Sequence, residues 1–326
     1  MSRYPEFDLS TITPQAFAER ESKVRVQDFA TPPRAGASFL DFLSSFPKIL
    51  AGPQIAEIAR SVDVARRQNR AAIWSIGGHV IKTGLAPVLN SLMEQGHVTA
   101  LAANGAVAIH DCELALFGST SEDVVHGLKT GTFGMSGETA AFYNDSIRDG
   151  ARLQLGIGES LGKALVERGA QYNNASVLAS AYRLGIPFSV HIGIGTDIVH
   201  MHPNADGAAV GEGSLRDFRI LTESMRGLAG GGVLLNIGSA VVLPEVLLKS
   251  IAILRNQDPE GFTDFLGVNL DFIQQYRSNQ QVVTRVQAIG GRGIALTGHH
   301  EILVPLLAQA IMEFGAESAP SANSDG

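Results

Sequence analysis

Short apolar segments alternate with amphipathic helical segments along most of this chain. Strand-like runs occupy residues 71–77, 98–103, 187–190, 231–238, 265–269 and 293–298. Between them, apolar residues recur at helical spacing, for example at Leu85, Leu89 and Leu92. Parallel strands need a crossover connection, which is usually a helix packed on the sheet. The sequence therefore predicts an α/β fold with a single doubly wound, mostly parallel sheet and helices on both faces.

Polar segments flank this pattern at both ends of the chain. Residues 1–35 are rich in proline, and we expect them to form an N-terminal arm that docks on a neighbouring subunit. Residues 36–314 are predicted to form one α/β domain, because neither an internal repeat nor a shift in composition divides them. Residues 315–326 are small and polar, which predicts a disordered tail.

Composition and net charge limit the kinds of molecule that this chain is expected to bind. The net charge of −7 argues against binding nucleic acid, which requires clustered Lys and Arg. No run of about 18 apolar residues is present, so no membrane span is expected. The single cysteine, Cys112, leaves neither a disulfide framework nor a thiolate zinc cluster and favours a cytoplasmic protein. The low charged fraction, 17%, suggests surface covered by other subunits in a homo-oligomer, a tetramer or a dimer.

Most of the histidines follow predicted strands. These are His79, His110, His191, His200, His202, His299 and His300. Ligands of open parallel sheets bind beyond the carboxyl ends of the strands, so we expect these side chains to share one edge. With Asp111, Asp197 and Asn236, they predict a pocket for a small-molecule substrate.

The segment HIGIGTDIVHMHP, residues 191–203, has three possible interpretations. Imidazole and carboxylate are common ligands of transition metals, and a divalent metal site is one possibility. The candidate ligands are His191, Asp197, His200, His202 and His300. The same groups can instead act as acids and bases, with Asp197, His191, His110 and Asn236 as the catalytic candidates. In the third interpretation, each histidine of a polar loop only satisfies backbone groups.

Two motifs are discounted. GIGESLG, residues 156–162, matches neither a dinucleotide fingerprint nor a phosphate loop in its glycine spacing, and it is interpreted as a helix entry. Cys112 beside His110 is interpreted as a buried core cysteine rather than a nucleophile. No serine lies in a G-x-S-x-G sequence, which argues against a serine hydrolase.

The order and spacing of several segments resemble deoxyhypusine synthase over about residues 36–314. The segments are residues 34–52, 77–107, 173–202, 229–236 and 299–314. The resemblance implies a homotetramer that binds NAD at the carboxyl edge of the sheet. It also implies transfer of an aminobutyl group from spermidine to a lysine, through an imine on an enzyme lysine. By the same resemblance, NAD contacts fall at Gly78, His79, Asn104, Gly105 and His299.

The residues of the family's chemistry are replaced here. Its catalytic lysine falls near Arg285, and no lysine follows Lys249 anywhere in the chain. Arginine cannot form the imine, because it stays protonated. The family's catalytic histidine corresponds to Asn236, whereas Asp197 retains one of its polyamine-binding acids. Deoxyhypusine synthase activity itself is therefore not expected.

Three functional hypotheses follow from the sequence. The first is a divergent enzyme of the deoxyhypusine-synthase-like family with a His/Asp-rich pocket, acting as a metal-assisted hydrolase or lyase. The second is an NAD-dependent transferase or oxidoreductase related to deoxyhypusine or homospermidine synthase. The third is a non-catalytic oligomeric paralogue. The candidate cofactors are accordingly a divalent transition metal or NAD.

Overall fold

The structure, a computed structural model, describes residues 2–317 of the 326-residue chain. The chain divides into two compact units, Met1–Pro53 and Gln54–Gly326. The boundary therefore falls later than residue 35, where the sequence placed the end of the arm. The predicted tail begins inside helix α14 (His300–Glu317), and the rest of it lies outside the described residues.

The first unit has little regular structure. It contains the one-turn helices η1 (Leu9–Thr11), η2 (Phe17–Glu19) and η3 (Val26–Asp28), and the short helix α1 (Phe39–Ser44). Ser38 caps α1 by accepting a hydrogen bond from the backbone N–H of Asp41 at 3.1 Å. Among residues 2–53, Leu43 is the only apolar side chain that is buried, so this unit has no core of its own.

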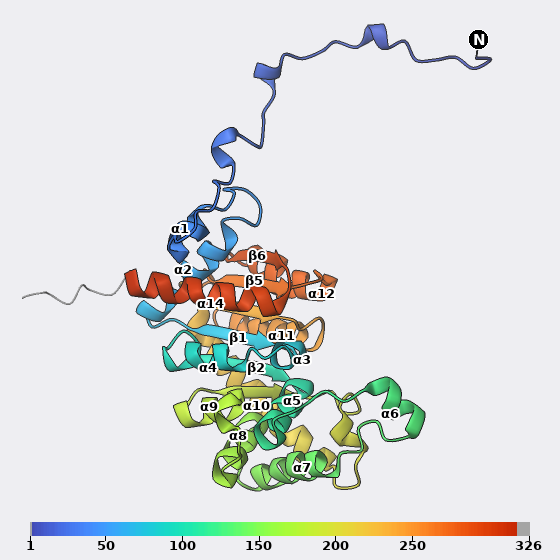
Figure 1. The fold of residues 1–326 in the computed structure, drawn as a ribbon, viewed down its shortest axis with the longest axis vertical. Coiled ribbons are helices and arrows are strands. Elements are labelled where there is room, and N and C mark those ends of the chain that lie inside the picture. Colours follow the sequence, from blue (N-terminus) through green and yellow to red (C-terminus); the bar gives the residue numbers. More distant parts are fainter. Residues whose placement is uncertain (1, 318–326) are drawn as a thin grey trace, which may run out of the picture. The chain divides into compact units, whose positions relative to one another are not determined.

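Six parallel strands form the sheet of the second unit, as the sequence predicts (Figure 1). They are β1 (Ala72–Ile76), β2 (Ala100–Asn104), β3 (Phe188–His191), β4 (Val233–Ile237), β5 (Leu266–Asp271) and β6 (Arg292–Thr297). Every neighbouring pair is parallel, and the order is β3-β2-β1-β4-β5-β6. This is the order of the doubly wound Rossmann fold. All six carboxyl ends therefore meet at one edge.

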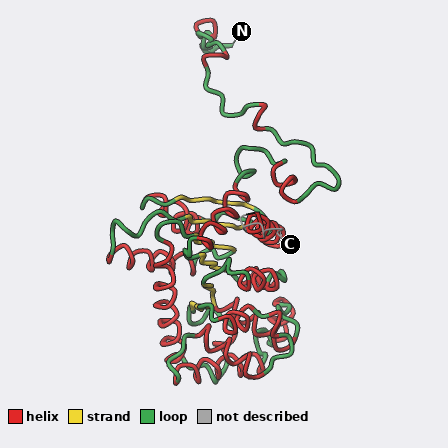
Figure 2. Tube along the Cα trace, turned by 90° about the vertical axis from the view of Figure 1, so that its left-hand side faces the viewer, coloured by secondary structure: helices red, strands yellow, loops and turns green. Residues whose placement is uncertain are grey.

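Helices cover both faces of this sheet, with the strands between them in Figure 2. The connections contain α2 (Gln54–Arg67), α3 (Gly78–Lys82), α4 (Ala86–Glu94), α5 (Gly105–Phe117), α6 (Val124–Thr130), α7 (Gly137–Arg152), α8 (Ile157–Arg168), η4 (Asn173–Ala175), α9 (Val177–Leu184) and η5 (Ile198–Met201). The second half contains α10 (Gly207–Met225), η6 (Arg226–Leu228), α11 (Val242–Gln257), α12 (Tyr276–Ser278), the π-helical turn η7 (Asn279–Thr284) and α13 (Arg285–Ala288). None of the helices in residues 2–317 has the length and apolar character needed to cross a bilayer.

Alternate residues along the strands face opposite helix layers. Ile73 and Leu234 belong to a buried cluster with residues of α10, α11 and η7. On the other face, α2 packs against α14 and contacts the central strands β1 and β4. The apolar face of α2, from Ile55 to Ala65, is buried. The strand residues on both faces of the sheet are therefore apolar, as expected for strands covered by helices on both sides.

Ser214 and Asp217 have the spacing of a capping box but lie inside α10, which begins at Gly207 because Asp206 accepts hydrogen bonds from the backbone N–H groups of its first turn. Ser214 and Asp217 instead bond to the end of β3, where Asp217 accepts from Val190 N at 2.7 Å. His110 and Asp111, which follow β2 in the sequence, lie on α5.

The carboxyl ends of β1 and β4 meet by close contact between backbones. A Cβ atom on Gly77, which follows β1, would overlap the carbonyl oxygen of Gly238, which follows β4. Gly238 itself has φ +69°, and a Cβ there would lie 2.6 Å from Cε1 of His300. Glycine is therefore required at both positions, and the point where the strand order reverses is tightly defined.

The first prediction tests this contact. Replacing Gly77 with Ala should lower the free energy of unfolding by about 2 kcal/mol or more, because the added methyl group has no room between two backbones. Urea unfolding measures this change. Gly137→Ala is the matched control, since a Cβ on Gly137 at the start of α7 meets nothing within 4 Å. Equal stabilities of the two variants would contradict the close contact.

Candidate functional site

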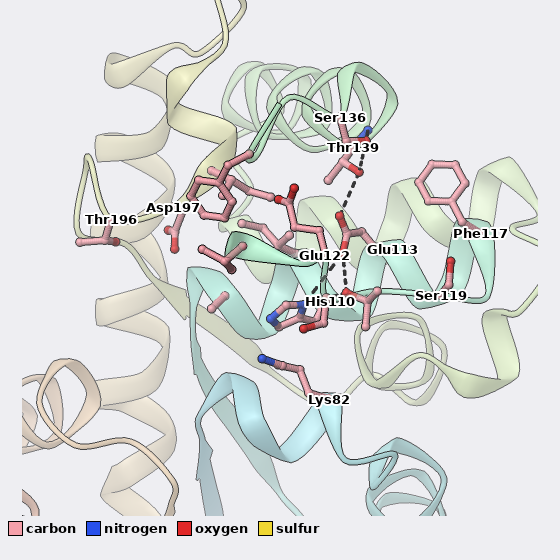
Figure 3. A pocket seen from close by; sticks show the side chains of 17 residues that line it. Lys82, His110, Glu113, Phe117, Ser119, Glu122, Ser136, Thr139, Thr196 and Asp197 are labelled. Carbon is pink, nitrogen blue, oxygen red and sulfur yellow. Dashed lines mark hydrogen bonds and ion pairs between the residues drawn. The ribbon is translucent and has the colours of Figure 1, made fainter. Parts of the chain in front are cut away.

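A cavity of about 650 Å³ opens beside α5 at the carboxyl edge of the sheet (Figure 3). It lies next to the ends of β1, β2 and β3. Lys82 of α3 lines it from one side, and Thr196, Asp197 and Ile198 line it from the loop after β3. The remaining lining residues are Ala106, Ile109, His110, Glu113 and Phe117 of α5, then Ser119, Thr120, Ser121, Glu122, Val124, Phe133, Ser136 and Thr139. This volume suits a small-molecule ligand.

One hydrogen-bonded chain runs along a wall of the cavity. Nδ1 of His110 lies 2.7 Å from the hydroxyl oxygen of Thr120, and that hydroxyl donates to Glu113 Oε2. The other carboxylate oxygen of Glu113 accepts from the hydroxyl of Thr139 at 3.1 Å. Figure 3 shows His110 and Glu113 pointing toward each other from α5. This arrangement fixes the His110 ring at the cavity wall.

His110 is neutral at physiological pH. Burial and, to a smaller extent, the nearby ammonium of Lys82 together lower the pKa of its imidazole to about 4. A neutral imidazole has one N–H donor and one lone pair that can accept. The cavity therefore presents His110 as a hydrogen-bonding group without a charge.

Asp197 covers the beginning of α5. Its Oδ2 atom is buried, makes no hydrogen bond to the described residues, and would be overlapped by a Cβ on Gly105. Burial raises the pKa of this carboxyl group, while the neighbouring His200 opposes the change. The structure thus brings two predicted catalytic residues, His110 and Asp197, into one cavity.

The other histidines of residues 191–203 are engaged elsewhere. Nδ1 of His200 accepts from the backbone N–H groups of Gly195 and Asp197, at 3.2 and 3.3 Å. His202 bonds through Nε2 to the carbonyl of Gly134 at 2.8 Å, and the buried His191 lies 3.0 Å from Ser189 Oγ. These rings stabilise loops and the end of β3.

The predicted metal site is not assembled. Within residues 2–317, no three His, Cys, Asp or Glu side chains converge in a way that could hold a metal ion. Of the predicted ligands His191, Asp197, His200, His202 and His300, the first is bonded inside the sheet and the last begins α14, beside Asp271 of β5. Spacing along the sequence suggested convergence, but the loop turns its histidines toward different backbone partners.

A second group of rings lies where β1, β4 and β5 end. The centroids of His79 and His300 are 5.5 Å apart, and the ring of Phe272 lies 6.0 Å from His79 and 5.7 Å from His300. His300 is fully buried, with Nε2 3.3 Å from Asp271 Oδ1. His299, in contrast, is largely exposed. Of the predicted cofactor contacts, Gly78, His79, Asn104 and Gly105 lie at the neighbouring ends of β1 and β2, and His299 precedes α14.

Asn236 and Asp111 have structural roles. The side-chain amide of Asn236 donates to Asn269 Oδ1 at 2.8 Å and to the carbonyl of Ser239 at 2.9 Å, within the sheet. Asp111 accepts from Ser176 and from the first backbone N–H groups of α9, and burial raises its pKa to about 6. Neither residue lines the cavity.

The sequence missed several residues of the cavity wall. Glu113, Thr120, Glu122 and Lys82 were not among its candidates, although all four line the cavity. One signal was available, because Glu113 follows His110 by three residues and such residues share a helix face. That signal is informative only if residues 105–117 are first recognised as a helix.

One family description matches part of the chain. Residues 56–174 match "Arginine dihydrolase ArgZ-like, C-terminal, Rossmann fold". The matched segment contains β1, β2 and most of the cavity wall. No curated protein matches the chain significantly. The sequence similarity is thus to an ArgZ-like Rossmann domain, which agrees with the observed sheet.

Solved structures show the same fold at low sequence identity. AgrE in complex with ornithine and NAD+ is 17% identical, with a TM-score of 0.50, over 81% of this chain and 33% of that one. A conserved putative LOR/SDH protein from Methanococcus maripaludis S2 is 17% identical, with a TM-score of 0.48, over 87% and 74%. A putative deoxyhypusine synthase from Entamoeba histolytica is 10% identical, with a TM-score of 0.49, over 85% and 94%. The AgrE structure thus has the same fold over about a third of its own length.

The second prediction concerns His191. Burial lowers its pKa to about 4, so between pH 6.5 and 4 the unfolded chain binds a proton that the folded chain does not. Stability must therefore fall as the pH falls through this window, by about 2 kcal/mol for this group between pH 6.5 and 5. In His191→Gln this contribution is absent. Urea unfolding of both proteins at pH 7.5 and 5.0 should show the smaller loss in the variant, and equal losses would contradict the assignment.

Proposed function

We propose that this chain is an NAD-dependent enzyme that acts on a small amine-bearing substrate. The observation that carries the proposal is the position of the cavity. It opens at the carboxyl edge of a Rossmann sheet, next to the ends of β1 and β2. Dinucleotides bind in such sheets where the strand order reverses, which here is between β1 and β4. A substrate in the cavity would lie at the same edge as the dinucleotide.

The residues at the ends of β1 and β2 are compatible with a dinucleotide. Gly77 and Gly78 form the turn from β1 into α3, where a main chain without side chains can approach a pyrophosphate. Asn104 ends β2, where Rossmann domains carry a ribose-binding acid, and it offers an amide instead. The rings of His79 and Phe272 are exposed beside this turn. When bound, NAD would supply hydride transfer.

The charges of the cavity favour a ligand that is mainly cationic. Its described lining contains the carboxylates of Glu113, Glu122 and Asp197 and the amine of Lys82. With His110 neutral, negative groups outnumber positive ones. A small molecule with protonated amines and one carboxylate would complement this lining. The AgrE structure with ornithine and NAD+ makes these two molecules the natural probes.

A metal-assisted hydrolase or lyase is not proposed, because the predicted ligands do not converge. Aminobutyl transfer through an enzyme imine is not proposed either. The chain has no lysine after Lys249, and the lysine near the cavity, Lys82, belongs to α3.

The third prediction tests the proposed function. NAD+ at millimolar concentration should raise the melting temperature by several degrees, because a ligand that binds only the folded state stabilises it. Ornithine should bind in its presence, with an affinity that isothermal titration calorimetry can measure. His79→Ala should weaken NAD+ several-fold, whereas Glu122→Gln should weaken ornithine and leave NAD+ unchanged. Gln309→Ala, on the exposed side of α14, is the control for both. A folded protein without affinity for NAD+ would overturn the proposal.

We also propose that the chain assembles with copies of itself. The first unit exposes many large apolar side chains, namely Tyr4, Phe7, Leu9, Ile12, Phe17, Val24, Val26 and Phe29. Such residues favour burial against another surface. The fourth prediction is that sedimentation of the full chain at micromolar concentration gives a dimer or a tetramer. A monomer across that range would contradict it.

A further inference from the structure

The hydrogen-bonded chain on the cavity wall determines where its protons lie. A threonine hydroxyl has one hydrogen to donate and lone pairs to accept with. The hydroxyl of Thr120 lies between two partners, Nδ1 of His110 and Oε2 of Glu113. It can donate to only one of them. The protonation of Glu113 therefore decides which nitrogen of His110 bears the hydrogen.

The surroundings of Glu113 are those of an ionised carboxylate. Its two oxygens face two hydroxyl groups, those of Thr120 and Thr139, and each can donate. Thr139 is itself free to donate, because Ser136 Oγ lies 2.8 Å from the Thr139 hydroxyl and can supply the hydrogen that this oxygen accepts. With Glu113 ionised, both threonine hydrogens point to the carboxylate.

The hydroxyl of Thr120 must then accept from His110. At 2.7 Å, the bond between these two residues requires a hydrogen on Nδ1. A neutral imidazole with its hydrogen on Nδ1 has its lone pair on Nε2. Nε2 has no hydrogen-bond partner among the described residues, and it belongs to a side chain that lines the cavity (Figure 3).

We propose that His110 is a specificity-determining residue of the cavity, a permanent hydrogen-bond acceptor at Nε2 for an N–H group of the ligand, with Thr120 and Glu113 as its positioning residues. The proposal deepens the proposed function, since it names the group that would receive an ammonium of the substrate. A protonated imidazole would repel such a ligand and could only donate. The low pKa of His110, about 4, agrees with a ring that stays neutral.

Charged groups face this ring from each side of the cavity. Lys82 approaches from α3, Glu113 from α5, Glu122 from the loop before α6, and Asp197 from the loop after β3. Oε2 of Glu113 lies 3.9 Å from Nδ1 of His110. The carboxylates of Glu122 and Asp197 would attract the cationic part of the ligand, and Nε2 would fix its orientation. Burial, with a smaller contribution from Lys82, keeps the ring from acquiring a proton.

The experiment is 15N NMR of histidine-labelled protein without ligand, with His110→Gln used to assign the signal. At pH 7.5 the wild-type His110 should show the neutral Nδ1–H tautomer, and it should keep that form at pH 5.5. Glu113→Gln reverses the direction of these hydrogen bonds. The glutamine amide can donate to the hydroxyl of Thr120, which then donates to Nδ1 of His110. The His110 signal of this variant should shift to the Nε2–H tautomer. A wild-type ring that is cationic or in the Nε2–H form would overturn the proposal.

Binding of ornithine in the presence of NAD+ supplies the second readout. Glu113→Gln and Thr120→Val should each weaken ornithine about tenfold or more, and Thr120→Ser, which keeps the hydroxyl, should restore wild-type affinity. Loss of affinity in Thr120→Ser equal to that in Thr120→Val would contradict the role of the hydroxyl. Because the tautomer is measured without ligand, its result is separate from that of the proposed function. The predicted Nδ1–H tautomer can be observed even if ornithine is not the substrate.

Discussion

The direct pairing of β1 with β4 is the constraint on which the carboxyl edge depends. These strands are far apart in the sequence, and Ser75 of one bonds to Asn236 of the other across 161 residues. Their pairing reverses the direction in which the sheet grows. The first half then winds outward through β2 and β3, and the second through β5 and β6. The glycines that follow both strands let their loops touch without side chains between them.

Two groups of side chains lie at this edge, one on each side of the point where the strand order reverses. His79, His300 and Phe272 gather where β1, β4 and β5 end, whereas His110 and Asp197 lie in the cavity beside β1, β2 and β3. Two neighbouring regions of one edge thus differ in chemistry. One has rings and glycine backbone, and the other has carboxylates, hydroxyls and a neutral imidazole. An enzyme that brings a dinucleotide and a small amine together needs both kinds of surface at adjoining positions.

The sheet was predictable from the sequence because its signals are local. Runs such as residues 71–77 and 231–238 are apolar throughout, as buried parallel strands must be, and the helices between them show regular apolar spacing. The start of α10 was not predictable in the same way. Ser214 and Asp217 have the spacing of a capping box, but both bond to β3, which is a tertiary contact. For the strands, the local sequence pattern matches the tertiary structure. For Ser214 and Asp217, it does not.

The sequence predicted which edge of the sheet holds the site, but not which side chains line the cavity. The rule of strand ends correctly brought His110 and Asp197 together, but it could not say which way each ring would turn. His202 and His200 bond to backbone groups whose positions depend on loop conformation, and Asp111 on α5 caps α9, which is a tertiary contact. Glu113 and Thr120 became recognisable only once α5 and the following loop were placed. Side-chain direction is the information that spacing along the chain lacks.

Hydrogen exchange measured with and without NAD+ and ornithine tests the central claim most directly, which is that the carboxyl edge around β1 and β2 is the ligand site. The account predicts that the two ligands together slow exchange in residues 76–82, 104–113 and 192–198, and leave the opposite edge of the sheet unchanged. Protection confined to other segments, or none at ligand concentrations that saturate binding, would contradict it.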